Sequence, residues 1–522
     1  MDRRWWEGAT LYQLYVRSWR DSDDDGYGDL RGIIGQLDYL EWLGIDGIWL
    51  SPTMPSPDKD WGYDVSDYLS VHPDLGSLDD LDALISGAGE RGMRVLLDLV
   101  PNHTSTEHPW FIESAANRQN GKRDYYVWAD PAPGGGPPNN WVDFTGAPAW
   151  RWDAGTGQFY LHNFLVEQAD LNWWNPAVHA EFDRILRFWF DRGVAGFRID
   201  VAHGLYKDAL LRDNPPAEGA GPLAGRFGLR AVYNENRPEV HGLYRDWRRV
   251  ANGYDPPRLL LGETWVPDLA SLASFYGQDD ELQLAFNFPL VFAAFEADDL
   301  ASVVGRTLDA LPAGGCPVWT ASNHDVDRFP SRWCGGEQAK IKLALLVLAT
   351  LPGTLVLYYG DEIGMTDVTV PAELSRDTLG GTSARPSRDR ARTPMQWDDS
   401  PTAGFTSPGV VGWLPVGDPA GCNVAAQRLD SSSVLSFCRE LIMLRREQAG
   451  PSAATRYERL RAPAGVWRYT AGTVEVAANF TGERATLREP PHGRVLLSTT
   501  ECGQADPAVL APWEGVIFSR GS

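Results

Sequence analysis

Eight short apolar runs, separated by helix-like segments, constrain the fold of this chain more than any other feature. The runs occupy residues 11–16, 45–50, 95–99, 194–199, 259–263, 284–288, 318–322 and 355–359. Helical periodicity appears between them, at 30–43, 78–91 and 180–192. Strands that alternate with helices are typical of parallel βαβ units, and eight such units predict a closed (β/α)8 TIM barrel of the α/β class.

Two interruptions of this alternation predict two further parts. Residues 104–171 are rich in Gly, Pro, Asn and aromatic residues, and we expect this insertion to wall one side of a pocket. From about residue 451 short alternating runs predict an antiparallel β domain. The expected division is therefore a barrel from 1–103 and 172–450, an inserted domain B from 104–171, and a C-terminal β domain from 451–522.

The charge balance narrows the choice of partner. The 47 Lys and Arg residues face 70 Asp and Glu residues, which gives a net charge of −23. Such a surface repels nucleic acid and anionic membranes, so a small neutral molecule is the expected partner, bound by a monomer or a homodimer. The sequence shows no membrane-spanning run, no signal-peptide core and five scattered cysteines, which together predict a cytoplasmic protein without disulfides, zinc or an organic cofactor.

Acidic residues stand at the carboxyl ends of several predicted strands. Asp98, Asp200, Glu263 and Asp325 end or follow the third, fourth, fifth and seventh strands. In a (β/α)8 barrel these ends meet on one face, where the chemistry takes place. Hydrolysis of a glycosidic bond with retention needs a nucleophilic carboxylate and a protonated one about 5–5.5 Å away. The pattern therefore favours carbohydrate chemistry.

Neighbouring residues suggest a role for each carboxyl group. Arg198 lies two residues before Asp200 on the same strand face, and its charge predicts an ionised, nucleophilic Asp200. Taken alone, Arg-x-Asp is more often a structural ion pair. Glu263 closes an apolar strand, where desolvation predicts a raised pKa and a role as general acid. Asp325, beside His324, is expected to hold sugar hydroxyls and stabilise a positively charged transition state.

Four short motifs carry a family resemblance. They are Asp98-Leu-Val-Pro-Asn102-His103, Gly196-Phe-Arg198-Ile-Asp200, Leu261-Gly-Glu263-Thr-Trp265 and Ser322-Asn323-His324-Asp325. In this order they resemble the motifs of the α-amylase family, glycoside hydrolase family 13, in its oligo-1,6-glucosidase and α-glucosidase branch. The resemblance extends from Trp5 to about Arg446. It implies that Asp200 is the nucleophile, Glu263 the acid/base, and Asp325 the third carboxylate that supports the transition state.

The resemblance also implies a set of residues that hold glucose. They are Tyr63, Asp64, His103, Arg198, His324 and Arg392, of which Tyr63 stacks on the ring. Asp64 and Arg392 would clamp the hydroxyls of the non-reducing end, which suits removal of single glucose units. His203 on the acceptor side and Phe164 as an aromatic wall are further candidates, and each is equally explained by packing.

An acidic loop after the first strand predicts a metal site. The side chains of Asp21, Asp23, Asp25 and Asp29 and the carbonyl of Tyr27 recur at every second position with Gly interposed. This arrangement is typical of loops that wrap a hard cation, although a solvated acidic turn has the same composition. The resemblance places a structural Ca²⁺ here, with Mg²⁺ as the alternative cation.

Together these features predict a retaining, exo-acting α-glucosidase that cleaves short α-glucosides through a covalent β-glucosyl-enzyme. A transferase or isomerase that passes the same intermediate to another sugar or alcohol is the main alternative. A non-catalytic carbohydrate-binding relative is a third, which the three retained carboxyl groups disfavour. Linkage preference stays open, because Val201 accompanies α-1,6 preference in relatives whereas Ala202-His203-Gly204 differs from that context. Ala169 also replaces the Pro usual in the branch's Gln-Pro-Asp-Leu-Asn segment.

Overall fold

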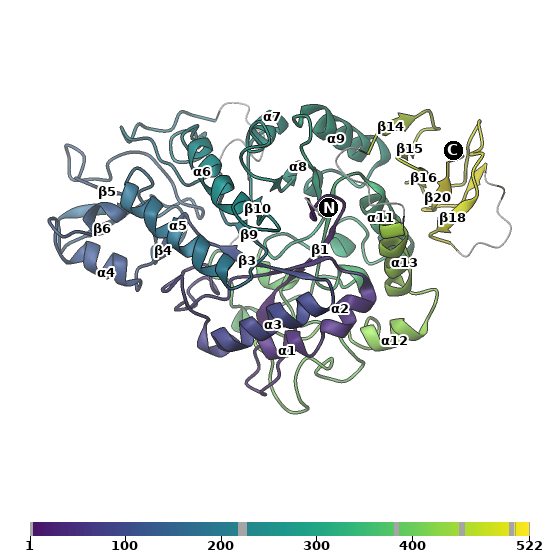
Figure 1. The fold of residues 1–522 in the computed structure, drawn as a ribbon, viewed down its shortest axis with the longest axis horizontal. Coiled ribbons are helices and arrows are strands. Elements are labelled where there is room, and N and C mark those ends of the chain that lie inside the picture. Colours follow the sequence, from purple (N-terminus) through teal and green to yellow (C-terminus); the bar gives the residue numbers. More distant parts are fainter. Residues whose placement is uncertain are drawn as a thin grey trace.

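A parallel barrel forms the centre of the molecule (Figure 1). The computed structural model describes residues 4–217, 227–380, 386–447, 455–500, 506 and 508–520. Eight strands pair in the order β11-β10-β9-β3-β2-β1-β13-β12, and a parallel bridge between Phe286 and Val318 closes the ring. The predicted (β/α)8 barrel is therefore confirmed. Its strands are β1 Thr10–Leu14, β2 Gly47–Leu50, β3 Arg94–Leu99, β9 Gly196–Ile199, β10 Leu259–Gly262, β11 Leu284–Ala285, β12 Val318–Trp319 and β13 Thr354–Tyr358.

Helices surround the strands as the alternation predicted, with one difference. The single helix expected at 30–43 is two helices, because Gly35 ends the first of them and Gly44 ends the second with a φ of 93°. Asp29 caps the first through the backbone N–H of Gly32. The main helices are α1 Leu30–Ile34, α2 Leu37–Leu43, α3 Leu78–Glu90, α5 Pro176–Asp191, α6 Val240–Asn252, α7 Leu269–Ser274, α8 Phe288–Val291, α9 Ala297–Ala310, α10 Phe329–Arg332, α11 Gln338–Thr350, α12 Val424–Leu429 and α13 Val434–Glu447.

Helix α5 shows how the sequence fixes the strand that carries Arg198. Asn175 caps the helix, Pro176 occupies its first position, and an apolar stripe follows at helical spacing. The buried members of that stripe are Val178, Phe182, Ile185, Leu186, Trp189 and Phe190. Burying one such side chain contributes roughly 1.5–3 kcal/mol. This packing holds the start of β9 against the barrel and so sets the position of its carboxyl end.

The insertion after β3 forms its own small sheets, seen beside the barrel in Figure 1. Strand β4 (His103–Ser105) pairs with β8 (Gln168–Asp170), and β5 (Trp128–Ala129), β7 (Gln158–Leu161) and β6 (Trp150–Asp153) form a second sheet beside α4 (Pro109–Ala116). The loop after β9 packs on this insertion, because Trp141 Nε1 donates to Arg212 O at 2.9 Å. The loop after β9 therefore contributes, together with the insertion, to the wall that the sequence predicted.

An antiparallel sheet lies at the other end of the molecule, in yellow in Figure 1. Its order is β14-β15-β16-β20-β18, as the alternating runs predicted, with β17 and β19 as a separate pair. The hydroxyls of Tyr469 and Thr350 lie 2.5 Å apart and join this sheet to α11. The strands are β14 Tyr457–Leu460, β15 Val466–Ala471, β16 Val474–Asn479, β17 Ala485–Thr486, β18 Val495–Ser498, β19 Val509–Leu510 and β20 Gly515–Ser519.

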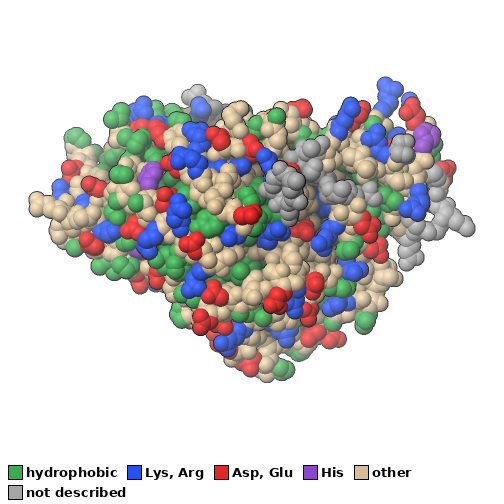
Figure 2. Space-filling model, in the orientation of Figure 1, with side chains coloured by type: hydrophobic (Ala, Val, Ile, Leu, Met, Phe, Trp, Pro, Cys, Tyr) green, Lys and Arg blue, Asp and Glu red, His purple; other side chains and the backbone are tan. Residues whose placement is uncertain are grey.

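The cysteines and the helix lengths of the described residues bear on disulfide formation and on membrane spanning. Cys316, Cys334, Cys422 and Cys438 are free, and Cys502 lies outside the described part of the chain. None of the helices that the structure describes is both long and apolar enough to cross a bilayer. On the face drawn in Figure 2, basic and acidic side chains are intermixed and no continuous basic field appears.

Candidate active site

A pocket of about 530 Å³ opens at the carboxyl ends of the barrel strands. One part of its wall is polar and the other is apolar or aromatic. The barrel and its loops supply most of the polar groups, while Phe144 and Phe164 come from the insertion. The lining residues are Asp60, Tyr63, His103, Phe144, Phe164, Gln168, Asp200, Val201, His203, Glu263, Trp265, Asp325, Leu379 and Arg388.

Arg198 organises the polar wall from behind. Its Nη1 contacts Asp98 Oδ1 at 2.9 Å and Asp200 Oδ1 at 2.6 Å, and its Nη2 contacts Glu263 Oε1 at 2.8 Å. Strands β3, β9 and β10 are neighbours, and the register opposite Arg198 is Asp98 on one side and Leu261 on the other. One guanidinium therefore holds the two carboxyl groups predicted to be nucleophile and acid/base against a single pocket.

Three buried carboxyl groups share the charge of Arg198. Burial raises the pKa of Asp200 well above its ordinary value, while Arg198 lowers it and the charges of Glu263 and Asp98 raise it further. Burial likewise raises the pKa of Asp98 to about 7. Arg198 therefore does not by itself offset the burial of Asp200, because one cation serves three buried carboxyl groups. The raised pKa of Asp98 and of Asp200 favours retention of a proton between these two groups near neutral pH.

Asp325 has the opposite electrostatics. Burial acts to raise its pKa, but His324, Arg388 and Arg392 outweigh burial and hold the pKa well below its usual range. Arg388 Nη1 and Arg392 Nη2 contact Asp325 Oδ1 at 3.0 and 3.1 Å. Because both guanidiniums are permanently charged, Asp325 is an anion at neutral pH. A buried anion at this place in the pocket wall is suited to stabilise a positively charged transition state.

The predicted sugar-binding residues fall into two groups. Tyr63, His103, Phe164 and His203 line the pocket. His324 is buried behind Tyr63: its ring stacks on the tyrosine at 5.3 Å, and Nε2 lies 2.6 Å from the Tyr63 hydroxyl. Burial lowers the pKa of both His103 and His324, so both are neutral near pH 7. Arg198, His324 and Arg392 are buried residues that do not line the pocket but support those that do.

Asp64 lies away from the pocket. Its carboxylate accepts hydrogen bonds from the Ser56 hydroxyl at 2.7 Å and from the backbone N–H groups of Lys59 and Asp60 at 3.0 and 2.9 Å. Burial raises the pKa of Asp64 to about 6. The structure therefore assigns Asp64 to holding the loop, and the clamp expected at this position needs another carboxylate.

Asp60 and Arg388 are the pocket residues that sequence reasoning missed. Arg388 Nη2 lies 2.8 Å from Asp60 Oδ1 and 2.7 Å from Asp377 Oδ1. Both Asp60 and Arg388 line the pocket, and they stand four residues before the predicted Asp64 and Arg392. The signal was present, since Asp64 and Arg392 each have a second residue of the same charge four positions earlier, but the sequence alone does not distinguish the two. The remaining unpredicted wall residues are Phe144, Gln168, Val201, Trp265 and Leu379.

A buried lysine joins three segments beside the pocket. Lys207 Nζ lies 2.7 Å from Asn102 Oδ1 and 2.8 Å from Asp170 Oδ2, and it also donates to the carbonyl of Gly204. Asn102 follows β3, Asp170 belongs to the insertion, and Lys207 follows β9. Asn163 Nδ2 extends the network to Asp170 Oδ2 at 2.7 Å. The network fixes the insertion, and with it Phe164, relative to the barrel.

The acidic loop after β1 brings three of its predicted ligands together. Asp21, Asp23 and Asp29 offer carboxylate oxygens within 4.8 Å of one another. Burial raises the pKa of Asp23, and the charges of Asp29 and Asp21 raise it further. Three hard anionic oxygens at this spacing fit a hard cation such as Ca²⁺ or Mg²⁺. Asp25 is not in this group, and its carboxylate accepts from the backbone N–H of Tyr27 at 2.7 Å.

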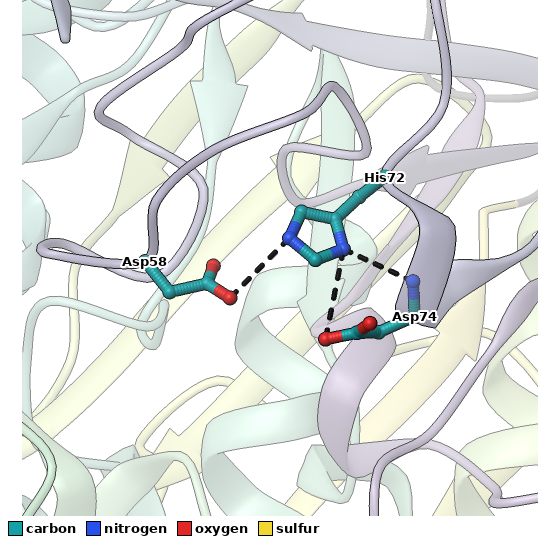
Figure 3. Close-up of side chains that lie close together, drawn as sticks. All are labelled: Asp58, His72 and Asp74. Atoms are coloured by element: carbon teal, nitrogen blue, oxygen red, sulfur yellow. Dashed lines mark hydrogen bonds and ion pairs between the residues drawn. The ribbon is translucent and has the colours of Figure 1, made fainter. Parts of the chain in front are cut away.

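A second acidic group has a structural explanation. Figure 3 shows His72 between Asp58 and Asp74, with Nε2 3.3 Å from Asp58 Oδ2 and Nδ1 accepting from the backbone N–H of Asp74 at 3.2 Å. Arg17 Nη2 already pairs with Asp58 Oδ1 at 2.7 Å. A cation here would have to displace that guanidinium. We therefore interpret this group as a hydrogen-bonded clasp of the loop that carries Asp60.

Comparison with known proteins agrees with this geometry. Residues 13–452 match the family described as Alpha amylase, catalytic domain. The chain is 38% identical over 471 residues to a probable alpha-glucosidase of Rhizobium meliloti (strain 1021), covering 87% of this chain and 84% of that protein. It is 35% identical over 569 residues to an oligo-1,6-glucosidase of Parageobacillus thermoglucosidasius, covering 99% of each. The solved structure of an alpha-glucosyl transfer enzyme, XgtA, superposes with a TM-score of 0.92 at 37% identity and 99% coverage of both chains.

The family match spans most of the chain, and the relatives exceed 30% identity over most of their own length. Both the barrel and the ordered motifs on its strands agree with that match. The chain therefore belongs to the α-amylase family of glycoside hydrolases, in the branch of α-glucosidases and oligo-1,6-glucosidases.

Proposed function

We propose that this protein is a retaining, exo-acting α-glucosidase that removes terminal glucose from short α-glucosides. The observation that carries the proposal is the pair of carboxyl groups, Asp200 and Glu263, held by the two terminal nitrogens of Arg198 at 2.6 and 2.8 Å in one pocket. A retaining mechanism needs two such groups on one sugar-sized space. The probable alpha-glucosidase and the oligo-1,6-glucosidase among its relatives support the same substrate class.

The proposed reaction has two steps. In the first, an oxygen of Asp200 attacks the anomeric carbon, the bond to the leaving oxygen breaks, and that oxygen takes a proton from Glu263. In the second, Glu263 takes a proton from water, whose oxygen attacks the same carbon and releases Asp200. The first step requires that Glu263 carries a proton and that Asp200 is ionised. Asp325 stabilises the positive charge that develops on the sugar ring.

The salt bridge between Arg388 and Asp60 supports exo action. Arg388 also contacts Asp325 and Asp377, so four charged groups meet at this part of the wall. Charge-assisted hydrogen bonds of this kind are well suited to hold several hydroxyls of one terminal sugar. A chain that continued past this wall would have to break these pairs. We therefore assign the clamp for the non-reducing end to Asp60 and Arg388.

Product analysis tests the proposal. Purified protein is incubated with maltose, isomaltose, trehalose, sucrose and starch, and the products are identified by NMR at early times. We expect glucose from a disaccharide, released first as the α anomer because two inversions give retention, and little action inside starch chains. Release of the β anomer first would contradict the two-step mechanism. Rapid loss of starch viscosity would contradict exo action.

A transferase or isomerase is the second candidate. The observation that favours it is the apolar part of the pocket wall, formed by Phe144, Phe164, Val201, Trp265 and Leu379. Such side chains hold a sugar or alcohol while excluding water from the glucosyl-enzyme. XgtA, a structural neighbour that is 37% identical to this chain, is described as an alpha-glucosyl transfer enzyme. New disaccharides in place of free glucose would identify this activity.

We also propose that Asp21, Asp23 and Asp29 hold a structural Ca²⁺ with the carbonyl of Tyr27 and Asp25 as further ligands. Removing it with EDTA should lower the melting temperature by several degrees, because a ligand at 100 times its Kd stabilises the native state by about 2.7 kcal/mol. Scanning calorimetry with 1 mM CaCl₂ or with EDTA measures the difference. Asp23→Asn should reduce the calcium response, while Asp74→Asn, in the clasp of Figure 3, should leave it intact. Equal melting temperatures with and without calcium would exclude the site.

The described elements support a division of the chain into three domains. We propose a barrel domain from 1–103 and 172–450, an inserted domain from 104–171, and a C-terminal domain from 451–522. Strands β4 to β8 support the insertion and strands β14 to β20 support the last domain. The boundary at 450 and 451 lies outside the described residues.

A further inference from the structure

Trp265 connects Glu263 to the aromatic side of the pocket. It follows β10, is half-buried and lines the pocket. Its Nε1 donates to Glu263 Oε1 at 2.8 Å. Its ring stacks on Phe288 with centroids 3.9 Å apart and planes 19° apart, and Phe292 lies 5.7 Å away. Phe288 is fully buried at the start of α8, so a rigid part of the barrel supports the indole from one side.

Three donors contact the Glu263 carboxylate, one through an ion pair and two through hydrogen bonds, and their sources differ. Arg198 Nη2 and Trp265 Nε1 both reach Oε1 at 2.8 Å, while the backbone N–H of Val201 reaches Oε2 at 2.9 Å. Arg198 is shared with Asp98 and Asp200, and the Val201 donor belongs to the backbone. An indole has a single N–H, and that of Trp265 is directed at Glu263. Trp265 is therefore the side chain dedicated to this carboxyl group.

We propose that Trp265 is the positioning residue for the acid/base role of Glu263, an inference that rests on the proposed glucosidase function. With two donors on Oε1, the transferable proton belongs on Oε2. When the bond from the anomeric carbon to the leaving oxygen breaks, its electron pair stays on that oxygen, which takes the proton from Glu263. The negative charge that results on Glu263 is stabilised by the indole N–H, because a donor to the ionised form favours that form. Trp265 thus assists proton transfer without touching the proton.

The leaving group gives a direct test. Cleavage of maltose requires a proton on the departing sugar oxygen, whereas α-glucosyl fluoride releases fluoride, which needs little protonation. Trp265→Phe keeps a six-membered aromatic ring for the stack on Phe288 and removes the five-membered ring that carries the N–H. We expect kcat/KM for maltose to fall about tenfold or more, since general acid catalysis contributes about 10²–10⁴ in rate. For α-glucosyl fluoride kcat/KM should stay within about twofold, because the nucleophilic step is unchanged.

Two further variants sharpen the test. Phe288→Leu removes the ring on which Trp265 stacks but retains the indole N–H. We expect kcat/KM for maltose to fall more than kcat/KM for α-glucosyl fluoride, as in Trp265→Phe, but by a smaller factor. Trp128→Phe is the matched control, because Trp128 Nε1 donates to Ser114 Oγ at 2.9 Å in the insertion and the residue does not line the pocket. We expect both substrates to be turned over normally by this control. If Trp265→Phe does not fold, the Phe288→Leu comparison still decides the question.

The outcomes separate the two hypotheses. Equal losses on maltose and α-glucosyl fluoride would show that Trp265 only packs the pocket and would overturn its positioning role. Unchanged turnover of maltose by Trp265→Phe would overturn it as well. If the unmodified protein cleaves neither substrate, the proposed glucosidase function fails instead.

Discussion

Asp200→Asn is expected to abolish hydrolysis of maltose, with kcat falling by about 10⁴-fold or more, because an amide cannot form the glucosyl-enzyme. The same substitution should not destabilise the fold. Burial and the charges of Glu263 and Asp98 raise the pKa of Asp200, so its charged form is unfavourable in the folded protein. A neutral side chain of the same shape removes that penalty. Steady-state kinetics and thermal unfolding of the same preparation measure both effects.

The control for this variant restores the missing nucleophile from solution. Asp200→Ala leaves space beside Arg198, and added formate or azide should recover turnover of α-glucosyl fluoride. Such recovery would place the lost function at the position of the carboxylate. Full activity of either variant on maltose, in a preparation free of wild-type protein, would exclude Asp200 as the nucleophile.

Arg198→Met is expected to cost about 3–5 kcal/mol of unfolding free energy at pH 7, because removing one partner of a buried ionic group leaves the others uncompensated. Asp98, Asp200 and Glu263 would then share a buried site without a cation. Urea unfolding measures the loss, and activity should disappear with it. The surface variant Arg184→Met, which breaks an exposed pair with Glu181, should change stability by only about 0.5 kcal/mol or less.

The effect of Arg198→Met should depend on pH in a defined direction. In the native protein the pKa of Asp98 is already raised to about 7. A carboxyl group whose folded pKa is raised binds its proton more tightly in the folded state, so its contribution to stability is present at low pH and lost as pH rises through the folded pKa. Removing the cation strengthens this behaviour. We therefore expect a smaller loss at pH 5 than at pH 8, and a pH-independent loss would contradict the electrostatic explanation.

The barrel was predictable because its signal is repeated. Eight apolar runs and their carboxyl-end acidic residues lie where strand pairing requires, as the register of Asp98 opposite Arg198 shows. The sequence did not predict that the helix at 30–43 is divided in two, because the apolar spacing continues across Gly35. Only the structure shows that Gly35 ends the first helix. Local sequence patterns predicted which helices and strands form, whereas their exact ends became known only from the backbone conformation.

The choice of site residues from the sequence was straightforward where a motif offered a single residue of the required charge. It went wrong where two residues of the same charge lay close together in the sequence. Asp60 and Asp64 are both acidic, but the carboxylate of Asp64 accepts hydrogen bonds from backbone N–H groups, whereas Asp60 lines the pocket. Arg388 and Arg392 both contact Asp325, and only Arg388 also reaches Asp60. The pKa of Asp200 depends on how many carboxyl groups share one cation, which no linear motif records. The hydrogen-bond partners and pKa values of these side chains depend on residues that are distant in the sequence and meet only in the folded protein.

The partners of the Asp60–Arg388 salt bridge are separated by 328 positions along the chain. A ribosome delivers Asp60 early and Arg388 only after the last barrel strand, so a nascent polypeptide carries Asp200 and Glu263 long before the Asp60–Arg388 pair can form. Translation that stops before position 388 would yield fragments with an unfinished binding surface. The order of synthesis therefore makes the proposed sugar clamp one of the last parts of the pocket to be completed.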